Sequence, residues 1–131
     1  MLERHGITTL DGALKAQVVA SDSLIFMSGM HPDSTEGDIR TQMREALANV
    51  DAALNLMGVD QSAIFSVHVW LKDMRWFGAM NAEWNAWADP DNPPARTCIA
   101  AELYRPDLLV ELVVTACRPA AATATFEGDG R

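Results

Sequence analysis

The fold is decided by residues 94–119, which read Pro94-Ala95-Arg96-Thr97-Cys98-Ile99-Ala100-Ala101-Glu102-Leu103-Tyr104-Arg105-Pro106-Asp107-Leu108-Leu109-Val110-Glu111-Leu112-Val113-Val114-Thr115-Ala116-Cys117-Arg118-Pro119. Two apolar runs flank a polar turn at residues 104–107, and this pattern predicts a β-hairpin. The expected apolar faces are Thr97, Ile99, Ala101 and Leu103 in the first strand, and Val110, Leu112, Val114 and Ala116 in the second.

Each predicted strand carries one charge, Arg96 in the first and Glu111 in the second, on the side away from the apolar face. A charged side chain is costly to bury unless it is paired or binds a ligand. These two residues could form a structural ion pair at an interface, or they could bind a small molecule. The second possibility makes them the first candidates for a functional site.

Composition limits the class of protein. The 131 residues are 49% hydrophobic and 21% charged, which fits one globular domain, expected at residues 1–119. Residues 120–131 have little to bury and are expected to be a disordered tail. The start lacks a signal-peptide core and no apolar run reaches membrane-span length, so we expect a cytoplasmic protein without membrane contact. The net charge of −8 argues against nucleic-acid binding.

The first half of the chain predicts a hairpin and a long helix. Strands are expected at residues 14–20 and 24–27, with a turn at 21–23 between them. Thr35 is expected to cap a helix that ends at Gly58. Its apolar stripe consists of Met43, Ala46, Leu47, Val50, Leu54 and Met57.

The second half continues with a strand and a second helix. Residues 63–71 alternate, which predicts a strand with Phe65, Val67, Val69 and Leu71 on its buried face. Asp73 is expected to cap a helix that runs to about Trp87. The resulting order β-β-α-β-α-β-β predicts an α+β fold, a mixed sheet with two helices packed on one face.

The side chains on the other face of this sheet are too apolar and too small for a face that is exposed to solvent. Its expected members are Ser66, His68, Trp70, Cys98, Ala100, Val113, Thr115 and Cys117. Because both helices are committed to the opposite face, we expect this face to be covered by other copies of the chain.

Several short motifs occur in a specific order. Pro94-Ala95-Arg96-Thr97-Cys98 is similar to the Pro-x-Arg-Ser/Thr-x signature of the RidA/YjgF family, and Val110-Glu111-Leu112 is similar to its Val/Ile-Glu-Ile/Leu element. Ser28-Gly29 and Gln42 fit the same pattern, and the run from Phe77 to Asn81 resembles a YoaB-like branch. The resemblance covers most of residues 14–118.

The resemblance implies a trimer of chains with a chorismate mutase-like (RidA-like) fold, and an enamine/imine deaminase with sites in the clefts between subunits. It implies that Arg96 holds the carboxylate of a 2-imino acid and that Glu111 acts on water and the leaving amine. The other residues expected to bind substrate are Ser28, Gly29, Cys98, Asn81 and His31. It implies no cofactor, because imines hydrolyse readily once positioned.

One departure from the family keeps an alternative open. Deaminases of this family have a Pro-Tyr-Ser-Gln-like element whose tyrosine lines the pocket, whereas residues 8–17 contain no tyrosine here. The alternative is a protein that binds or senses a carboxylate metabolite without turning it over. RNA cleavage, a label attached to some family members, fits the net charge of −8 least well.

The predicted hairpin also separates the two charges. If its apolar faces align, Arg96 lies opposite residues 115–117, four to six residues along the strand from Glu111. That corresponds to about 13–20 Å between backbones. A small substrate therefore requires residues from two subunits.

The cysteines and histidines have simpler interpretations. Cys98 lacks a histidine to serve it and is expected to be a small buried thiol, and His68 is expected at an interface. His31 either borders the pocket or lies in a surface turn. The three histidines and two cysteines have no metal-ligand spacing, so we expect no metal site.

Overall fold

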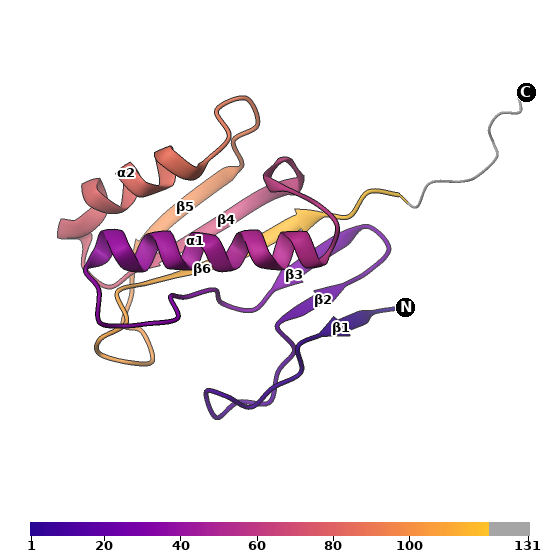
Figure 1. Cartoon of the computed structure of the whole chain (residues 1–131), viewed down its shortest axis with the longest axis horizontal. Coiled ribbons are helices and arrows are strands. Elements are labelled where there is room, and N and C mark those ends of the chain that lie inside the picture. Colours follow the sequence, from indigo (N-terminus) through magenta and orange to yellow (C-terminus); the bar gives the residue numbers. More distant parts are fainter. Residues whose placement is uncertain (121–131) are drawn as a thin grey trace, which may run out of the picture.

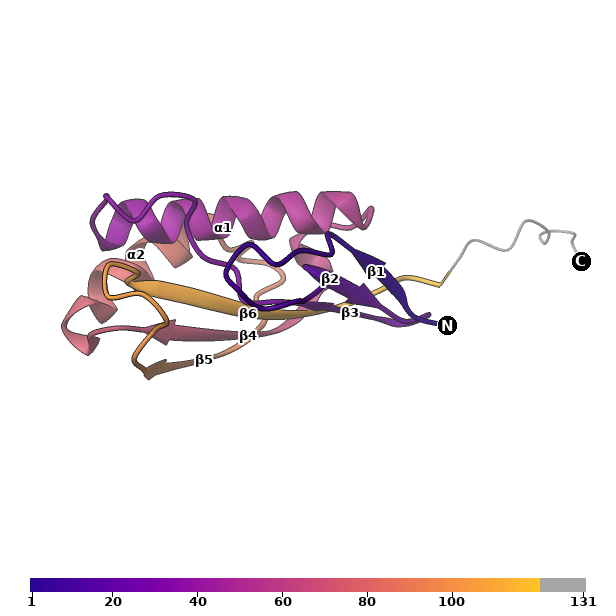
Figure 2. The same ribbon diagram turned by 90° about the horizontal axis from the view of Figure 1, so that it is seen from below.

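A six-stranded sheet in the order β1-β2-β3-β6-β4-β5 forms one layer, and two helices cover one of its faces (Figures 1 and 2). The computed structural model describes residues 1–120. The strands are β1 Glu3–His5, β2 Val18–Ala20, β3 Leu24–Met27, β4 Ile64–Leu71, β5 Ala95–Ala100 and β6 Val110–Cys117. The helices are α1 Ile39–Leu56 and α2 Phe77–Trp87.

The predicted α+β fold and element order are confirmed, with one additional strand at the start. β1 pairs antiparallel with β2, with Glu3 beside Ala20. Its three residues are polar and too few to show an alternating pattern, so sequence periodicity gives no signal for it. The expected tail at residues 120–131 lies, apart from Ala120, outside the described residues.

The prediction of a hairpin between β5 and β6 is wrong. β4 lies between them, parallel to β5 and antiparallel to β6. Helix α2 connects β4 to β5, and a strand–helix–strand unit places its two strands side by side and parallel. The polar turn predicted at 104–107 exists within a longer connection, residues 101–109, that carries the chain past β4 to its other edge.

The same pairing reverses the expected faces of β5. Arg96 lies beside Val67, and Cys98 lies beside Val69. Since both valines are buried under the helices, Arg96 and Cys98 share the helix-covered face. Ile99 lies instead on the outer face and is exposed. The apolar pattern gave the wrong prediction because β5 is an edge strand in which the outer-face residues are more apolar than the residues under the helices.

A β-bulge corrects one further prediction, the burial of Phe65. The register between β4 and β6 shifts between Ile64 and Ser66. As a result Ile64 enters the core with 6% exposure, while Phe65 is 41% exposed. Val67, Val69 and Leu71 are buried as predicted.

Helix α1 carries its predicted stripe into the core but begins later than predicted. Met43, Ala46, Leu47, Val50 and Leu54 are buried.

The cap of α1 is Asp38, whose carboxylate accepts a hydrogen bond from the Thr41 N–H. Thr35 instead donates its hydroxyl proton to Asp107 at 2.7 Å, which ties this loop to the one before β6. Gly58 ends the helix with a φ of 74°, as a C-terminal glycine does.

Asp73 starts the second helical segment as predicted. Its carboxylate accepts from the Arg75 N–H and caps a short 3₁₀ turn, Met74–Trp76, that leads into α2. Met80 and Trp84 are the buried residues of α2. Within residues 1–120, neither helix has both the length and the apolar character needed to cross a bilayer.

The outer face of the sheet carries no helix (Figure 2). His68, Trp70 and Ile99 are exposed there, next to half-buried Val113 and Thr115. Two residues expected on this face, Cys98 and Ala100, belong to the helix-covered face instead. The corrected outer face gains Ile99 and is therefore more apolar than the sequence pattern indicated.

Gln42 is the buried polar residue that joins α1 to the loop before β6, with 0% exposure. Its amide nitrogen donates to the carbonyls of Thr35, Gly37 and Asp107 at 3.0–3.3 Å. Its amide oxygen accepts from the Leu109 N–H at 2.9 Å. One side chain thus fixes where β6 enters the sheet.

Replacing Gln42 by methionine keeps the shape and removes these hydrogen bonds. Because the Leu109 N–H and the Asp107 carbonyl then lose their bonds to the buried Gln42 amide, we expect a loss of about 1–3 kcal/mol in the free energy of unfolding. Urea unfolding followed by circular dichroism measures it. The control is Asn55→Leu, an exposed amide on the same helix, and equal stabilities of the two variants would contradict this role.

Candidate functional site

Six of the seven predicted site residues fall into two groups on opposite faces of the sheet, and the seventh, Ser28, belongs to neither. Glu111 lies on the outer face beside Trp70, and Gly29 and His31 lie near it. Arg96, Cys98 and Asn81 form the second group, between β5 and helix α2. No predicted residue belongs to both groups.

Glu111 is held against the end of β3. The backbones of Met30 and Leu112 exchange two hydrogen bonds of 2.7 and 2.8 Å, which bring the residue after Gly29 alongside β6. A Cβ atom on Gly29 would overlap the Glu111 carboxylate. An alanine at position 29 would therefore force the end of the Glu111 side chain to move. Within residues 1–120 Glu111 forms no ion pair.

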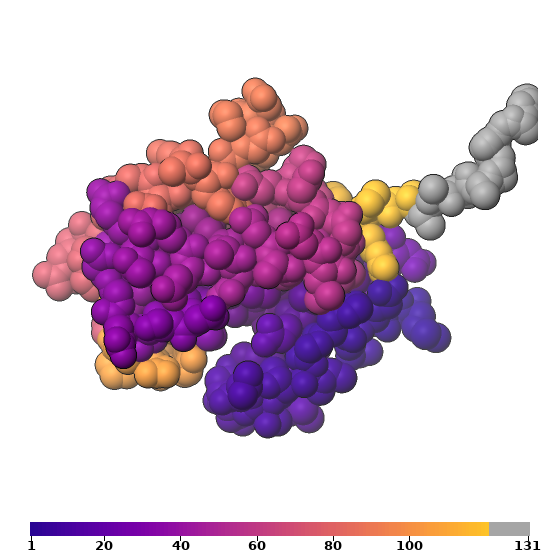
Figure 3. Space-filling model, viewed as in Figure 1, coloured from indigo at the N-terminus to yellow at the C-terminus, as the bar shows by residue number. Residues whose placement is uncertain are grey.

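A cavity of about 360 Å³ opens in front of Glu111. It lies between the N-terminal loop and the loop before β6, where the space-filling view shows a notch (Figure 3). Its lining residues are Asp11, Ala13, Lys15, Gly29, His31, Trp70, Glu102, Leu103, Tyr104 and Glu111. We call it the Glu111 cavity.

Two further residues of this cavity, Lys15 and Tyr104, were not among the predicted site residues. The Lys15 ammonium pairs with Asp11. Tyr104 reaches the cavity from the other loop, with its ring centroid 5.9 Å from that of His31. Lys15 belongs to residues 8–17, the segment in which the resemblance places a pocket residue, so the sequence held a signal for it. The pairing of Tyr104 with His31 depends on the tertiary fold.

Ser28 has a structural contact. Its hydroxyl donates to the Ala16 carbonyl at 2.7 Å, which joins the end of β3 to the N-terminal loop. It does not line the Glu111 cavity; it lines a second, larger cavity on the other side of Gly29. Gly29, His31 and Lys15 line both cavities.

Arg96 lies half-buried on aromatic and sulfur groups of α2. Its guanidinium carbon is 5.2 Å from the centre of the Trp84 ring and 5.9 Å from that of Phe77. Its Nη1 lies 3.6 Å from the Met80 sulfur. Among the described residues it has no carboxylate partner. The stacking holds the planar cation and leaves its donors available for an anion.

Asn81 and Cys98 accompany Arg96. Asn81 lies on α2 between Phe77 and Trp84 in the sequence, and its side-chain oxygen is buried without a hydrogen-bond donor. An unpaired buried acceptor is uncommon and calls for a donor from elsewhere. Burial raises the pKa of the Cys98 thiol, and the opposing effect of Arg96 is smaller. Cys98 is therefore a neutral thiol near pH 7, as the sequence predicted, and a poor nucleophile.

The two groups of one chain are far apart. Arg96 aligns through Val67 with Val114, three residues along β6 from Glu111 and two strands away. This places the backbones about 14 Å apart. The side chains also point to opposite faces. One small molecule therefore cannot contact both Arg96 and Glu111 of the same chain. The cause is the intervening strand β4 and the opposite faces, and not the hairpin register that the sequence predicted.

Comparison with known proteins identifies a family. A sequence model described as endoribonuclease L-PSP matches residues 13–118. The chain is 31% identical over 101 residues to the RutC family protein YoaB of Escherichia coli, covering 77% of this chain and 88% of that protein. It is 31% identical over 108 residues to a RutC family protein of Haemophilus influenzae, covering 82% and 93%.

A solved structure agrees with these matches. NMB1025 of Neisseria meningitidis, a member of the YjgF protein family, superposes with a TM-score of 0.85 at 31% identity. The match covers 92% of this chain and 98% of that one.

Adding a methyl group to Gly29 should disturb the site through Glu111. We expect Gly29→Ala to cost roughly 1–3 kcal/mol in the free energy of unfolding, because the new Cβ overlaps the carboxylate. In a Glu111→Ala background the same substitution should cost less, since the obstacle is gone. A double-mutant cycle by urea unfolding measures the difference. Equal costs in both backgrounds would show that Glu111 does not occupy this space.

Proposed function

The chain belongs to the RidA/YjgF family, and we propose that it is an enamine/imine deaminase that hydrolyses 2-imino acids to 2-oxo acids and ammonia. The observation that carries the proposal is the pair of complementary half-sites. Among residues 1–120, Arg96 is an unpaired guanidinium supported on Trp84, and Glu111 is an unpaired carboxylate facing a cavity. A 2-imino acid offers a carboxylate to the first and an electrophilic carbon to the second.

Arg96 binds the substrate carboxylate. A guanidinium presents parallel N–H donors that match a carboxylate in two hydrogen bonds. Its contact with the Trp84 and Phe77 rings fixes the plane of these donors. Anchoring the carboxylate in this way fixes the adjacent C=N carbon, and positioning lowers the barrier without further chemistry.

Glu111 acts on the water. As the water oxygen bonds to the imine carbon, the π electrons move to nitrogen and Glu111 takes a water proton. Glu111 returns this proton to the nitrogen, which gives a tetrahedral carbinolamine with an amino group. Glu111 then takes the hydroxyl proton as the C=O forms and passes it to the amino group, so that the C–N bond breaks with ammonia as the leaving group. Water and imine thus yield the 2-oxo acid and ammonia, with no cofactor required.

Neighbouring residues complete the proposed site. The free Asn81 oxygen suits an N–H donor of the substrate or of the adjoining subunit. Cys98, a neutral thiol, provides a small surface beside Arg96. His31 and Tyr104 form the wall of the cavity near Glu111.

The proposed assembly is a homotrimer in which Arg96 of one subunit meets the Glu111 cavity of the next. Two observations support it: the separation of the half-sites within a chain, and an outer sheet face with exposed Trp70 and Ile99. Exposed apolar patches of this kind mark protein contacts. A closed ring repeats one interface and so creates equivalent sites.

A binding protein without turnover is the second candidate. It is favoured by the absence of a tyrosine from residues 8–17, the segment that contributes Lys15 to the Glu111 cavity. Saturable binding of 2-oxobutanoate, with no ammonia released from any 2-imino acid, would select it. Cleavage of RNA, the activity in the description of the family model, is opposed by the net charge of −8.

Ammonia release from 2-iminopropionate, generated in situ by an amino-acid oxidase, tests the reaction. We expect Arg96→Ala and Glu111→Gln to lower the rate above buffer by about 100-fold or more, since each removes a group that acts on the substrate. Arg75→Ala is the control, an arginine stacked on Trp76 outside both half-sites. A wild-type rate equal to buffer would refute the deaminase.

Mixed assemblies test whether the site is shared. Co-refolding the Arg96→Ala and Glu111→Gln proteins in equal amounts leaves each interface one chance in four of having both intact residues. We expect about a quarter of wild-type activity in the mixture, although each parent is inactive. A mixture as inactive as its parents would contradict a site between subunits.

Thr115 tests the assembly itself. It lies on the outer face between Phe26 and Ser66, and an arginine there would be buried by a covering subunit. An unpaired buried guanidinium costs several kcal/mol, so we expect Thr115→Arg to dissociate the trimer and abolish activity together. Analytical ultracentrifugation measures the first effect. A wild-type monomer at micromolar concentration that retains activity would overturn the assembly.

A further inference from the structure

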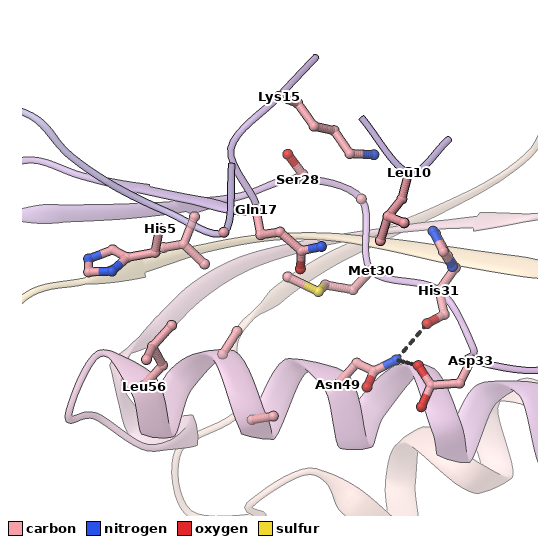
Figure 4. A pocket seen from close by; sticks show the side chains of 15 residues that line it. His5, Leu10, Lys15, Gln17, Ser28, Met30, His31, Asp33, Asn49 and Leu56 are labelled. Atoms are coloured by element: carbon pink, nitrogen blue, oxygen red, sulfur yellow. Dashed lines mark hydrogen bonds between the residues drawn. The ribbon is translucent and has the colours of Figure 1, made fainter. Parts of the chain in front are cut away.

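The larger of the two cavities that adjoin Gly29 has no role in the proposed reaction. It has a volume of about 420 Å³ and lies on the helix side of Gly29, between the N-terminal loop and α1 (Figure 4). Glu111 and Arg96 do not line it. Its volume falls in the range typical of small-molecule sites. We call it the α1 cavity.

The floor and one wall of the α1 cavity are apolar. Val18 and Met30 come from the sheet, and Ala52, Ala53 and Leu56 come from α1. Leu10 projects from the N-terminal loop toward Met30 on the opposite side (Figure 4). Leu10 and Leu56 are large apolar residues that are exposed in the free chain. An apolar ligand would remove both from water.

The polar groups at one end favour an anion. Lys15 and Asp33 are the only lysine, arginine, aspartate or glutamate residues that line the cavity within residues 1–120. The Asp33 carboxylate already accepts from the Asn49 amide at 3.1 Å. Lys15 pairs with Asp11, which does not line this cavity.

Lys15 can leave its partner at low cost. An exposed ion pair contributes about 0–1 kcal/mol, so a ligand carboxylate can replace Asp11 as the partner of the ammonium. Gln17 adds an amide that points into the cavity in Figure 4. Its backbone is fixed by hydrogen bonds to His5 and from Ser28, so this amide is presented on a rigid support.

From this arrangement we propose that the α1 cavity is a second ligand site, which binds a small carboxylate with an apolar chain. The carboxylate contacts Lys15 and Gln17, and the chain lies against Met30, Ala53 and Leu56. The site is separate from the proposed catalytic one. It shares Lys15, Gly29 and His31 with the Glu111 cavity, and so the two sites meet at these residues.

Octanoate is the probe, and isothermal titration calorimetry on the intact protein is the measurement. We expect saturable binding of octanoate and no binding of octylamine at the same concentration. The reason is that the Lys15 ammonium, which can turn into the cavity, attracts a carboxylate and repels an amine. Lys15→Met should weaken octanoate binding by about tenfold or more, through loss of a charge-assisted hydrogen bond. Lys72→Met, a lysine outside both cavities, is the control and should bind as the wild type does.

Filling the cavity gives an independent test. Ala52 is exposed on α1 and lines the cavity, so Ala52→Trp should occupy the space and abolish octanoate binding. Ala48, exposed one turn earlier on the same helix and outside the cavity, provides Ala48→Trp as the matched control. Glu111→Gln should leave octanoate binding unchanged, which separates this site from the proposed reaction.

The outcomes that overturn the proposal are specific. They are no octanoate binding up to about 10 mM, octylamine binding as tightly as octanoate, or an unchanged affinity in both Lys15→Met and Ala52→Trp. Loss of octanoate binding in Glu111→Gln would place the ligand in the Glu111 cavity and would also refute it.

Discussion

The position of β4 between β5 and β6 is the constraint on which the rest of the site depends. It separates the two strands that carry the charges, and the pairing of Arg96 with Val67 and of Glu111 with Trp70 sends these charges to opposite faces. No rotamer change reverses this, because the face of a strand residue is fixed by the pleat. Within one chain the two charges therefore cannot contact the same small molecule.

Each half-site is supported in a different way. Arg96 depends on the helix face, where Trp84 and Phe77 hold its guanidinium. Glu111 depends on the absence of a side chain at Gly29 and on the backbone bridge between Met30 and Leu112. The cation thus lies over aromatic rings, which stabilise it, and the carboxylate lies against the backbone of Gly29. The proposed reaction relies on this positioning.

Sequence periodicity correctly predicted elements that bury a single apolar face, and it failed for the strand at the edge of the sheet. Helix α1 is an example of the first, since the residues that recur every 3.6 positions are the ones that are buried. β5 is an example of the second, because an edge strand needs no buried apolar face and its pattern pointed the wrong way. The bulge at Phe65 and the cap at Asp38 depend on local backbone geometry, which periodicity does not encode.

The candidate site was predictable as a set of residues but not as an arrangement. The motifs identified Arg96 and Glu111, and only the tertiary fold separates them. Lys15 is the clearest example of a residue whose role depends on the fold around it. Its backbone is fixed by paired hydrogen bonds with Thr8, so the loop geometry is independent of the side chain it carries. A different side chain at position 15 would change the chemistry of both adjoining cavities while the support stays the same, which is how one scaffold comes to serve different ligands.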